Sequence, residues 1–380
     1  MTSRFFSRLS QLILLMNFLL LIFFVTENIE LLFGEEVGNL NRVKQVRKVK
    51  ILKGDNFYEV YIDGESFARY VTDFEGNPII YPIYEKGGKL MTRSFPMEER
   101  DVVSRDHLHQ RSFWFSHGKV NDSDFWANDK KLKNVGRIEH QKFIRAEMYD
   151  ETTAIIVTEN NWRSHQGEIL CSDIRSFRFG VTEFDNRYID FDITVTAKVD
   201  KATFYDTKEG TFGIRVADSL AIDIARAKKN KDKNKSKDKD KSNQADVVST
   251  SYIMNADGKL DEEAWGKRSS WVDYVGQIDD DIVGIVVMNH PTSFRYPTYW
   301  HVRTYGLFAA NPFGERGFGI RKKPMDNKSI DGKNIEGGNF VLERGKSFKL
   351  SYRIIFHAGD TKKASIEEEF KKYSSENLSK

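Results

Sequence analysis

Cysteine and proline are both scarce in this sequence of 380 residues, which contains one cysteine and seven prolines. The single cysteine, Cys171, excludes an intrachain disulfide and any metal or iron–sulfur site built from several cysteines. Phenylalanine and tyrosine are abundant by contrast, with 28 and 15 copies. Few prolines and many aromatic residues are typical of sheets whose faces are filled by aromatic and β-branched side chains.

A strong net charge is also missing, because the formal charge is only +3. Eight lysines fall within residues 228–244, KKNKDKNKSKDKDKSNQ, so the rest of the chain is close to neutral or acidic. No nucleic-acid partner is therefore predicted. The lysine and aspartate run has no apolar residue and is interpreted as a disordered insertion on the surface of one domain. A polyanion-binding tail is the alternative, which the interleaved aspartates disfavour.

Several well-known sequence motifs do not occur. The sequence has no P-loop, no dinucleotide glycine fingerprint, no Gly-x-Ser-x-Gly elbow and no zinc-protease helix. Nucleotide-dependent and serine-hydrolase chemistry are therefore not favoured.

The long apolar run of the sequence stands at its start, where Leu12–Val25 contains only Asn17 as a polar residue and follows Arg4 and Arg8. Residues 1–26 are predicted to be a signal peptide or an N-terminal membrane anchor, although Thr26-Glu27-Asn28 is a poor cleavage site. The run at residues 9–25 is near the lower limit for a membrane span. We expect the body of the protein to be exported, either periplasmic or secreted, or held at the inner membrane by this segment.

Short runs with alternating apolar residues follow from residue 43. They recur at residues 43–52, 57–71, 77–84, 154–162, 173–181, 188–199, 211–222, 284–290 and 348–359. This period of two predicts β-strands joined by hairpins. Residues 365–373 have the spacing of a short terminal helix. The predicted fold is all-β, a large antiparallel β-sandwich formed by a single domain over residues 43–373, with the insertion at 228–244 and a short C-terminal helix.

The most unusual stretch is Asn289–Gly314, NHPTSFRYPTYWHVRTYGLFAANPFG, which combines histidines, arginines and aromatic residues. If residues 300–305 are extended, His301, Arg303 and Tyr305 share one face and Trp300 faces the other way. The stretch is interpreted as a functional surface. The alternative is that its aromatic residues are core and its polar residues are satisfied internally.

A second unusual stretch is Asp106–Trp126, DHLHQRSFWFSHGKVNDSDFW. In an extended strand His107, His109 and Arg111 share a face, and they are suited to bind a carboxylate or to transfer protons near neutral pH. A divalent metal held by the two histidines with His117 or a distant carboxylate is an alternative, which the neighbouring arginine disfavours. A polar strand with satisfied side chains is the third reading.

Three further charged residues lie within apolar strands. Asp173 and Arg175 share a face and are predicted to form an internal ion pair. Arg215 either has a structural partner or holds an anionic ligand, because a charge in an apolar strand is costly otherwise.

Taken in order, DHLHQRSFWFSHGKVNDSDFW, GTFGIRVAD, AWGKRSSWVDYVG and HPTSFRYPTYWHVRTYGLFAANPFG resemble the bacterial family labelled "methane oxygenase PmoA-like", over roughly residues 45–360. Leu108 and Gln110 depart from the family's usual Asp-His-Pro-His-His-Arg, which puts in doubt a mechanism that needs an imidazole at position 110. The resemblance carries no settled activity, and it implies an exported β-sandwich from bacteria that degrade polysaccharides. The residues that match its motifs are His107, His109, Arg111, His117, Asn121, His290, Arg295, His301, Arg303 and Asn311.

The resulting hypothesis is an exported carbohydrate-active enzyme that performs acid–base chemistry on a sugar or uronate. Large sandwiches, including the galactose-mutarotase type, often present such residues on a concave sheet. The predicted catalytic residues are His107, His109 and His301. The predicted substrate-binding residues are Arg111, His117, Asn121, Arg215, His290, Arg295, Trp300, Arg303, Tyr305 and Asn311. No cofactor is predicted. A non-catalytic glycan-binding or envelope protein and a metal-dependent oxidase are the alternatives.

Overall fold

The computed structural model describes residues 47–100, 103–127, 131–227, 251–319 and 338–377. The predicted N-terminal segment at 1–26 and the predicted insertion at 228–244 lie outside the described residues. Within the described ranges, no helix is both long and apolar enough to cross a bilayer.

One sheet has nine strands: eight follow the order β1-β2-β3-β4-β6-β12-β17-β16, and β5 pairs with the C-terminal end of β4. All of its pairings are antiparallel. Its strands are β1 (Val49–Lys53), β2 (Phe57–Ile62), β3 (Glu65–Val71), β4 (Ile79–Glu85), β5 (Lys89–Leu90), β6 (Phe113–His117), β12 (Gly210–Arg215), β16 (Tyr299–Val302) and β17 (Leu307–Asn311).

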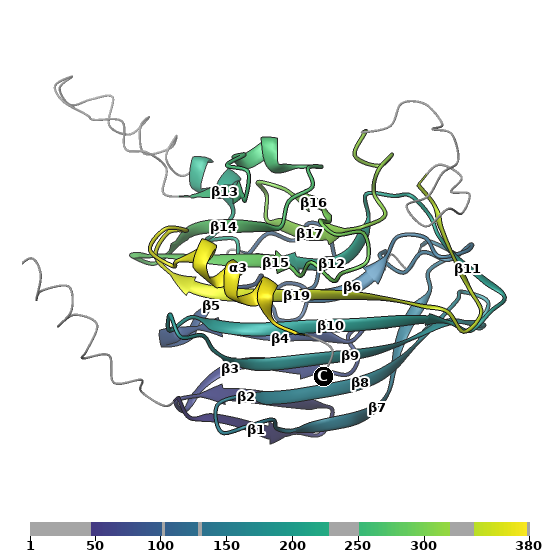
Figure 1. The fold of residues 1–380 in the computed structure, drawn as a ribbon, viewed down its shortest axis with the longest axis horizontal. Coiled ribbons are helices and arrows are strands. Elements are labelled where there is room, and N and C mark those ends of the chain that lie inside the picture. Colours follow the sequence, from purple (N-terminus) through teal and green to yellow (C-terminus); the bar gives the residue numbers. More distant parts are fainter. Residues whose placement is uncertain (1–46, 101–102, 128–130, 228–250, 320–337, 378–380) are drawn as a thin grey trace, which may run out of the picture. The chain divides into compact units, whose positions relative to one another are not determined.

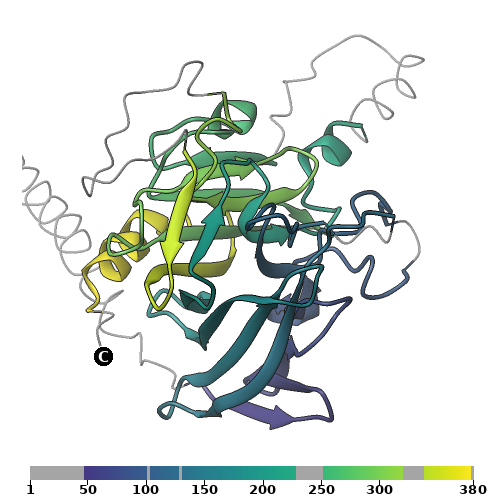
Figure 2. The ribbon, with the colours of Figure 1, turned by 90° about the vertical axis from the view of Figure 1, so that its right-hand side faces the viewer.

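The second sheet has eight antiparallel strands in the order β13-β14-β15-β19-β10-β9-β8-β7 (Figure 1). These strands are β7 (Arg137–Met148), β8 (Ala154–Arg163), β9 (Ile169–Val181), β10 (Arg187–Ala197), β13 (Tyr252–Asn255), β14 (Trp271–Ile278), β15 (Asp281–Asn289) and β19 (Ser347–Ala358). A small ribbon of β11 (Lys201–Phe204) and β18 (Phe340–Glu343) faces the viewer in Figure 2.

Aromatic side chains join the two sheets. Phe113 of β6 meets Phe191 of β10 with ring centroids 5.3 Å apart and Phe177 of β9 at 6.0 Å. All three side chains are almost fully buried. Each such ring stabilises the sandwich by roughly 1.5–3 kcal/mol through burial alone. The abundance of phenylalanine therefore has a direct structural counterpart, and the prediction of an all-β sandwich is confirmed.

The predicted terminal helix is present as α3 (Ile366–Ser375). Its buried residues Ile366 and Tyr373 pack with Trp271, Met288 and Ile355 on the face of the eight-stranded sheet that points away from the other sheet. Figure 1 shows the helix lying across β15 and β19. Two short 3-10 turns, η1 (Lys86–Gly88) and η3 (Asp261–Ala264), complete the regular elements that have assigned bounds.

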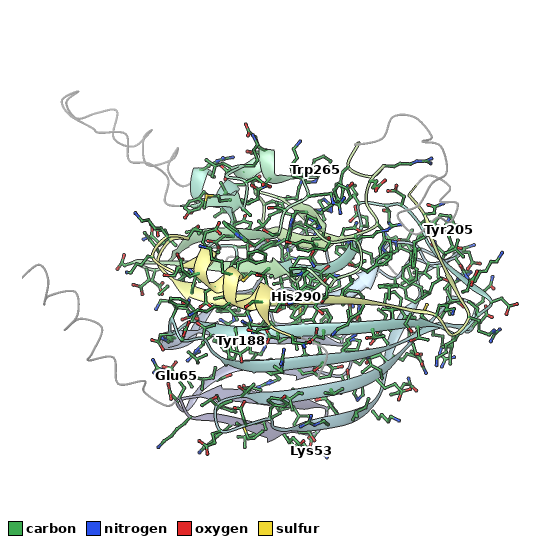
Figure 3. All side chains as sticks on the ribbon, in the orientation of Figure 1. Lys53, Glu65, Tyr188, Tyr205, Trp265 and His290 are labelled. Atoms are coloured by element: carbon green, nitrogen blue, oxygen red, sulfur yellow. The ribbon has the colours of Figure 1, made fainter. Side chains whose placement is uncertain are left out.

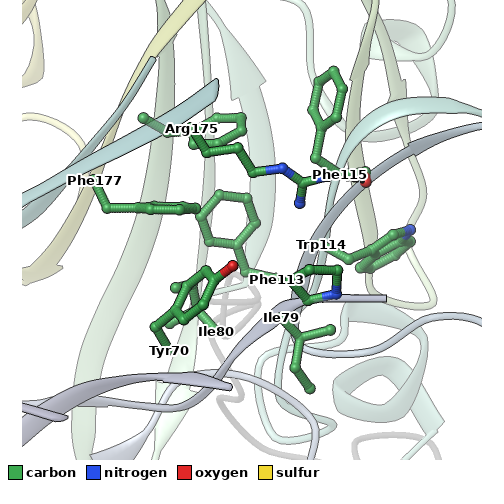
Figure 4. A pocket seen from close by; sticks show the side chains of 10 residues that line it. Tyr70, Ile79, Ile80, Phe113, Trp114, Phe115, Arg175 and Phe177 are labelled. Atoms are coloured by element: carbon green, nitrogen blue, oxygen red, sulfur yellow. Dashed lines mark hydrogen bonds between the residues drawn. The ribbon is translucent and has the colours of Figure 1, made fainter. Parts of the chain in front are cut away.

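The predicted ion pair between Asp173 and Arg175 lies inside the sandwich, with both side chains at most 2% exposed. Arg175 donates from Nε and Nη2 to the two carboxylate oxygens at 3.0 Å each, and the indole of Trp162 donates to Asp173 at 2.7 Å. The guanidinium reaches the edge of a small internal cavity beside Phe115 and Tyr70 (Figure 4). The charges are buried but well partnered, which is the condition for tolerating them.

Strand order also determines which loops meet. β12 lies between β6 and β17, and its last residues, Ile214 and Arg215, pair with the first residues of those strands, Phe113 and Leu307. The loops that precede β6 and β17 therefore lie together at the Arg215 end of β12.

Candidate functional site

The loop before β6 is not the strand that alternation predicted. Residues 103–112 belong to no strand, and the amide of Gln110 donates to the carbonyl of His107 at 2.9 Å in a tight turn. His107 has a φ of 47°. His107, His109 and Arg111 therefore do not share a strand face, because the backbone turns between them.

The second predicted strand is also shorter than expected. β16 ends at Val302, and the amide of Gly306 donates to the carbonyl of Arg303 at 2.9 Å in the turn that leads to β17. Gly306 has a φ of 111°, a conformation that favours glycine. His301 therefore belongs to a strand, whereas Arg303 and Tyr305 belong to a turn.

These two corrected segments come into direct contact. The ring of His107 lies parallel to that of Tyr305, with centroids 5.0 Å apart and an interplanar angle of 6°. The side-chain amide of Gln110 donates to the hydroxyl of Tyr305 at 3.2 Å, across 195 residues of sequence. The two unusual stretches of the sequence are therefore in contact at these residues.

Two buried arginines hold the first loop. Arg93 donates to Asp106 Oδ1 at 2.5 Å and Arg215 donates to the same oxygen at 3.0 Å. Arg215 also donates to the side-chain oxygen of Gln110 at 2.7 Å, and its guanidinium lies 4.8 Å from the ring centre of Tyr305. The second oxygen of Asp106 lies 2.6 Å from Nδ1 of His107. Arg215 is therefore a buried support of the site and has structural partners.

His301 points to the outer face of the nine-stranded sheet, since its neighbours Trp300 and Val302 belong to the core between the sheets. Its Nδ1 lies 2.9 Å from the carbonyl oxygen of Lys208, which only accepts hydrogen bonds. The proton is therefore on Nδ1, and Nε2 of the neutral ring carries a lone pair. Burial lowers the pKa of His301 to about 4, so the ring is neutral at pH 7.

His109 is the second histidine with a depressed pKa. Burial, together with the nearby His107, lowers the pKa of His109 to about 4. The carboxylate of Glu209 opposes this shift, and it opposes the shift of His301 as well. Glu209 therefore lies within electrostatic range of histidines from both unusual stretches. Its side chain is 34% exposed and pairs with Lys208 at 3.1 Å.

An aromatic and cationic border completes the cluster. The ring of Trp265 lies 6.2 Å from that of His301, and the guanidinium of Arg303 lies 5.6 Å from the Trp265 ring centre. Burial raises the pKa of Tyr305, so this phenol stays protonated over the ordinary pH range.

We call His107, His109, Glu209, His301, Arg303 and Tyr305 the His–Glu cluster.

Small residues of β12 and β17 lie beside His301 in the nine-stranded sheet. Gly213 of β12 pairs with Ala309 of β17, which pairs in turn with His301. A Cβ atom at Gly213 would stand 2.7 Å from the ring of Trp114, so the glycine allows the indole to lie directly on the strand. Trp114 in turn packs on Trp126, with ring centroids 4.9 Å apart.

Comparison with known families matches residues 58–371 to the model of a family of unknown function, DUF6807. The match covers most of the chain. The chain belongs to the DUF6807 family.

Two solved structures are similar to this DUF6807 chain. A galactose mutarotase related enzyme from Lactobacillus acidophilus has 10% identity and a TM-score of 0.32, and the alignment covers 81% of this chain and 97% of that one. A GalM/aldose epimerase homologue from C. elegans has 8% identity and a TM-score of 0.29, with 83% and 100% covered. At these scores neither likeness supports an inference about function. A search of curated proteins found no match.

Several residues predicted to bind substrate are instead buried parts of the DUF6807 framework. His117 is 0% exposed, donates from Nε2 to the carbonyl of Tyr205 at 2.8 Å, and packs against Phe313. Trp300 is also 0% exposed and donates to the carbonyl of Ser269 at 2.9 Å. Neither ring reaches a surface, because strand alternation turns both into the core.

Four more predicted residues hold loops together through main-chain contacts. Arg111, 2% exposed, donates to the carbonyl of Phe74 at 3.0 Å, and Arg295 donates to that of Pro312 at 3.0 Å. Asn121 accepts from the amide of Thr203 at 2.8 Å. Asn311 accepts from the amide of Phe313 at 2.9 Å. These partners use groups that had been expected to face a ligand.

His290 lies in another part of the molecule. Its ring packs on Tyr373 of α3 with centroids 5.0 Å apart, and Figure 3 shows it beside that helix whereas Trp265 stands near β16. The stretch Asn289–Gly314 therefore passes from one sheet to the other, because β15 belongs to the eight-stranded sheet and β16 to the nine-stranded sheet.

Sequence reasoning missed Glu209, Asp106 as a partner of His107, Gln110 and Arg93. Asp106 and Gln110 belong to the stretch Asp106–Trp126, but strand alternation placed them on the face opposite His107, His109 and Arg111. Glu209 and Arg93 had no local signal, since only strand order brings them to the cluster. Among the residues that the structure describes, no group of three or more His, Cys, Asp or Glu is placed to hold a metal ion.

Proposed function

We propose that this chain is an enzyme that transfers protons on a carbohydrate substrate at the His–Glu cluster. The observation that carries the proposal is the contact between two distant stretches, in which His107 stacks on Tyr305 and both His109 and His301 lie within electrostatic range of Glu209. Convergence of several imidazoles and a carboxylate is suited to general acid–base catalysis.

The protonation states support the basic half of such a reaction. The depressed pKa values of His109 and His301 leave both rings neutral at pH 7, and the bond from His301 Nδ1 to Lys208 leaves Nε2 as the proton acceptor. A neutral imidazole takes a proton from the substrate, and the imidazolium that forms returns it to another substrate atom. Glu209 stabilises that transient positive charge.

A sugar or uronate fits the other groups. The ring of Trp265 offers an apolar face for the C–H surface of a sugar ring, while imidazole, phenol and carboxylate groups exchange hydrogen bonds with hydroxyls. Arg303 is exposed and lies beside Trp265, where it is suited to a substrate carboxylate.

The test is a panel of neutral hexoses, hexuronates and unsaturated or glycosidic derivatives incubated with the full chain and followed by proton NMR. His301→Asn retains a donor near the Nδ1 position, so the bond to Lys208 is preserved, but it has no group at Nε2. We expect at least a roughly 100-fold loss of turnover with little change in the melting temperature.

His117→Gln is the matched control, because it alters a buried histidine of the same sheet that lies in the core. It should retain turnover. Sugar binding that is lost in Tyr305→Ala, without turnover of any panel member, would instead indicate a glycan-binding protein. Full activity of folded His301→Asn would refute the assignment of His301 as a proton acceptor.

A further inference from the structure

Asp106 has an unusually strong set of partners for a half-exposed residue. Its Oδ1 accepts hydrogen bonds from Arg93 Nη1 at 2.5 Å and from Arg215 Nη2 at 3.0 Å. The two arginine side chains are 0% and 2% exposed, whereas Asp106 is 42% exposed. Guanidinium groups only donate, so Oδ1 is committed to the interior. The remaining oxygen, Oδ2, is the one that meets His107.

The contact between Oδ2 and His107 Nδ1 is 2.6 Å long. An ionised carboxylate only accepts, so the proton in this contact belongs to Nδ1. A neutral His107 ring then has no proton on Nε2. The His107 side chain is 42% exposed, and its Nε2 is the ring nitrogen that this contact leaves for a substrate.

We propose that Asp106 is a positioning residue that fixes His107 in the tautomer with the proton on Nδ1, so that Nε2 of His107 is a second proton acceptor of the His–Glu cluster beside Nε2 of His301. The consequence for catalysis rests on the proposed function. The tautomer itself is a property of the free protein. An aspartate that holds one imidazole nitrogen and thereby defines the role of the other is a general device of acid–base sites.

Arg93 also holds the main chain of the loop that carries the His107 ring. Arg93 Nη2 donates to the carbonyl oxygens of His107 and Gln110, at 3.1 and 3.2 Å. One face of the imidazole is covered by Tyr305. The ring plane and the ring nitrogen assignments are therefore set by separate contacts, which is what orientation for proton transfer needs.

The ionised state of Asp106 is supported by its surroundings. Burial alone would raise the pKa of Asp106, but the charges of Arg215 and Arg93 and the bond to His107 outweigh burial and lower it. Asp106 therefore stays a carboxylate through the pH range in which histidine titrates. A neutral acid, which could donate toward His107, does not form there.

Asp106→Asn gives a sharp test, because asparagine has one acceptor and one donor in place of two acceptors. Arg93 and Arg215 can only donate, so the amide oxygen must face them and the amide nitrogen must face His107. That nitrogen donates to Nδ1, which forces the ring proton to Nε2. We therefore expect the substitution to reverse the His107 tautomer.

The measurement is long-range proton–nitrogen NMR of the histidine side chains in the full chain, at about pH 9, where an ordinary histidine is neutral. The His107 signals are assigned by their loss in His107→Gln. Wild type should have the proton on Nδ1, and Asp106→Asn should have it on Nε2. Asp218→Asn is the control: Asp218 accepts from Ser104 Oγ at 2.8 Å in the same region and has no bond to His107. It should leave the tautomer unchanged.

A wild-type His107 ring with its proton on Nε2 would overturn the proposal. This measurement uses the wild-type protein alone, so it does not depend on whether a variant folds. Retention of the wild-type tautomer in folded Asp106→Asn would overturn the proposal too. Because neither measurement uses a substrate, a failure to find any sugar turnover would count against the proposed function and leave this result standing.

Discussion

The imidazole of His107 and the phenol ring of Tyr305 lie parallel, with centroids 5.0 Å apart and an interplanar angle of 6°. This stack joins a loop that precedes β6 to a turn that precedes β17, so two stretches far apart in sequence are in direct contact. Arg215 contacts the Tyr305 ring as well, at 4.8 Å. The phenol is thus a structural centre of the His–Glu cluster.

Two substitutions of Tyr305 should distinguish the contribution of its ring to stability from that of its hydroxyl. Tyr305→Phe retains the stack and loses only the bond from Gln110, so the free energy of unfolding should fall by about 0.5–1.5 kcal/mol. Tyr305→Ala also removes the ring beneath His107 and should cost roughly 2 kcal/mol or more. Denaturant titration measures both. Equal costs for the two variants would mean that the stack contributes no stability.

Removal of the buried Arg175 should destabilise the protein far more than removal of the exposed Arg145. Arg175→Met leaves Asp173 buried without its charged partner, so the free energy of unfolding should fall by about 3–5 kcal/mol. Arg145→Met is the control, since Arg145 pairs with Glu147 at the surface, where the side chains are 42% and 58% exposed. It should cost less than about 1 kcal/mol. A similar loss of unfolding free energy in both variants would show that the buried ion pair is no more important for stability than the exposed one.

Stability at acid pH should depend on His117. Burial lowers the pKa of His117 to about 4, below an unfolded value of about 6.5. The unfolded state therefore binds more protons between these values, so stability is present above about pH 6.5 and is lost as the pH falls toward 4. His117→Gln retains a donor for Tyr205 but does not titrate. The unfolding free energy of wild type should fall relative to this variant over that range. Parallel curves would contradict the shift.

His357 should give the opposite dependence. Burial would lower the pKa of His357, but the carboxylate of Asp273, bonded to Nε2 at 3.0 Å, outweighs it and the pKa is raised. Stability from this pair is fully present below the unfolded pKa of about 6.5 and is lost as the pH rises through the folded value. His357→Gln keeps a donor to Asp273 without a charge, so wild type should lose its advantage over the variant at alkaline pH. A constant difference between pH 6 and 9 would exclude a raised pKa.

Much of the fold was predictable because strand alternation is a local property. Residues 154–162 alternate as expected, with Ile156 and Trp162 in the core and Glu159 toward solvent. The same rule failed at His107 and His109. There, two buried arginines from other parts of the chain bind Asp106 and hold the segment in a loop, so no local pattern describes it.

The class of fold, the terminal helix and the Asp173–Arg175 pair were predictable from local patterns, because periodicity and the cost of an unpaired buried charge act within a few residues. The sequence also pointed to two stretches rich in histidine. Which residues of the two stretches meet depends on the packing of the whole chain. The tertiary structure placed His117 and Trp300 in the core, and it brought Glu209 near His109 and His301. Those relationships follow from the order of strands in the sheet, which depends on pairings between residues far apart in the chain.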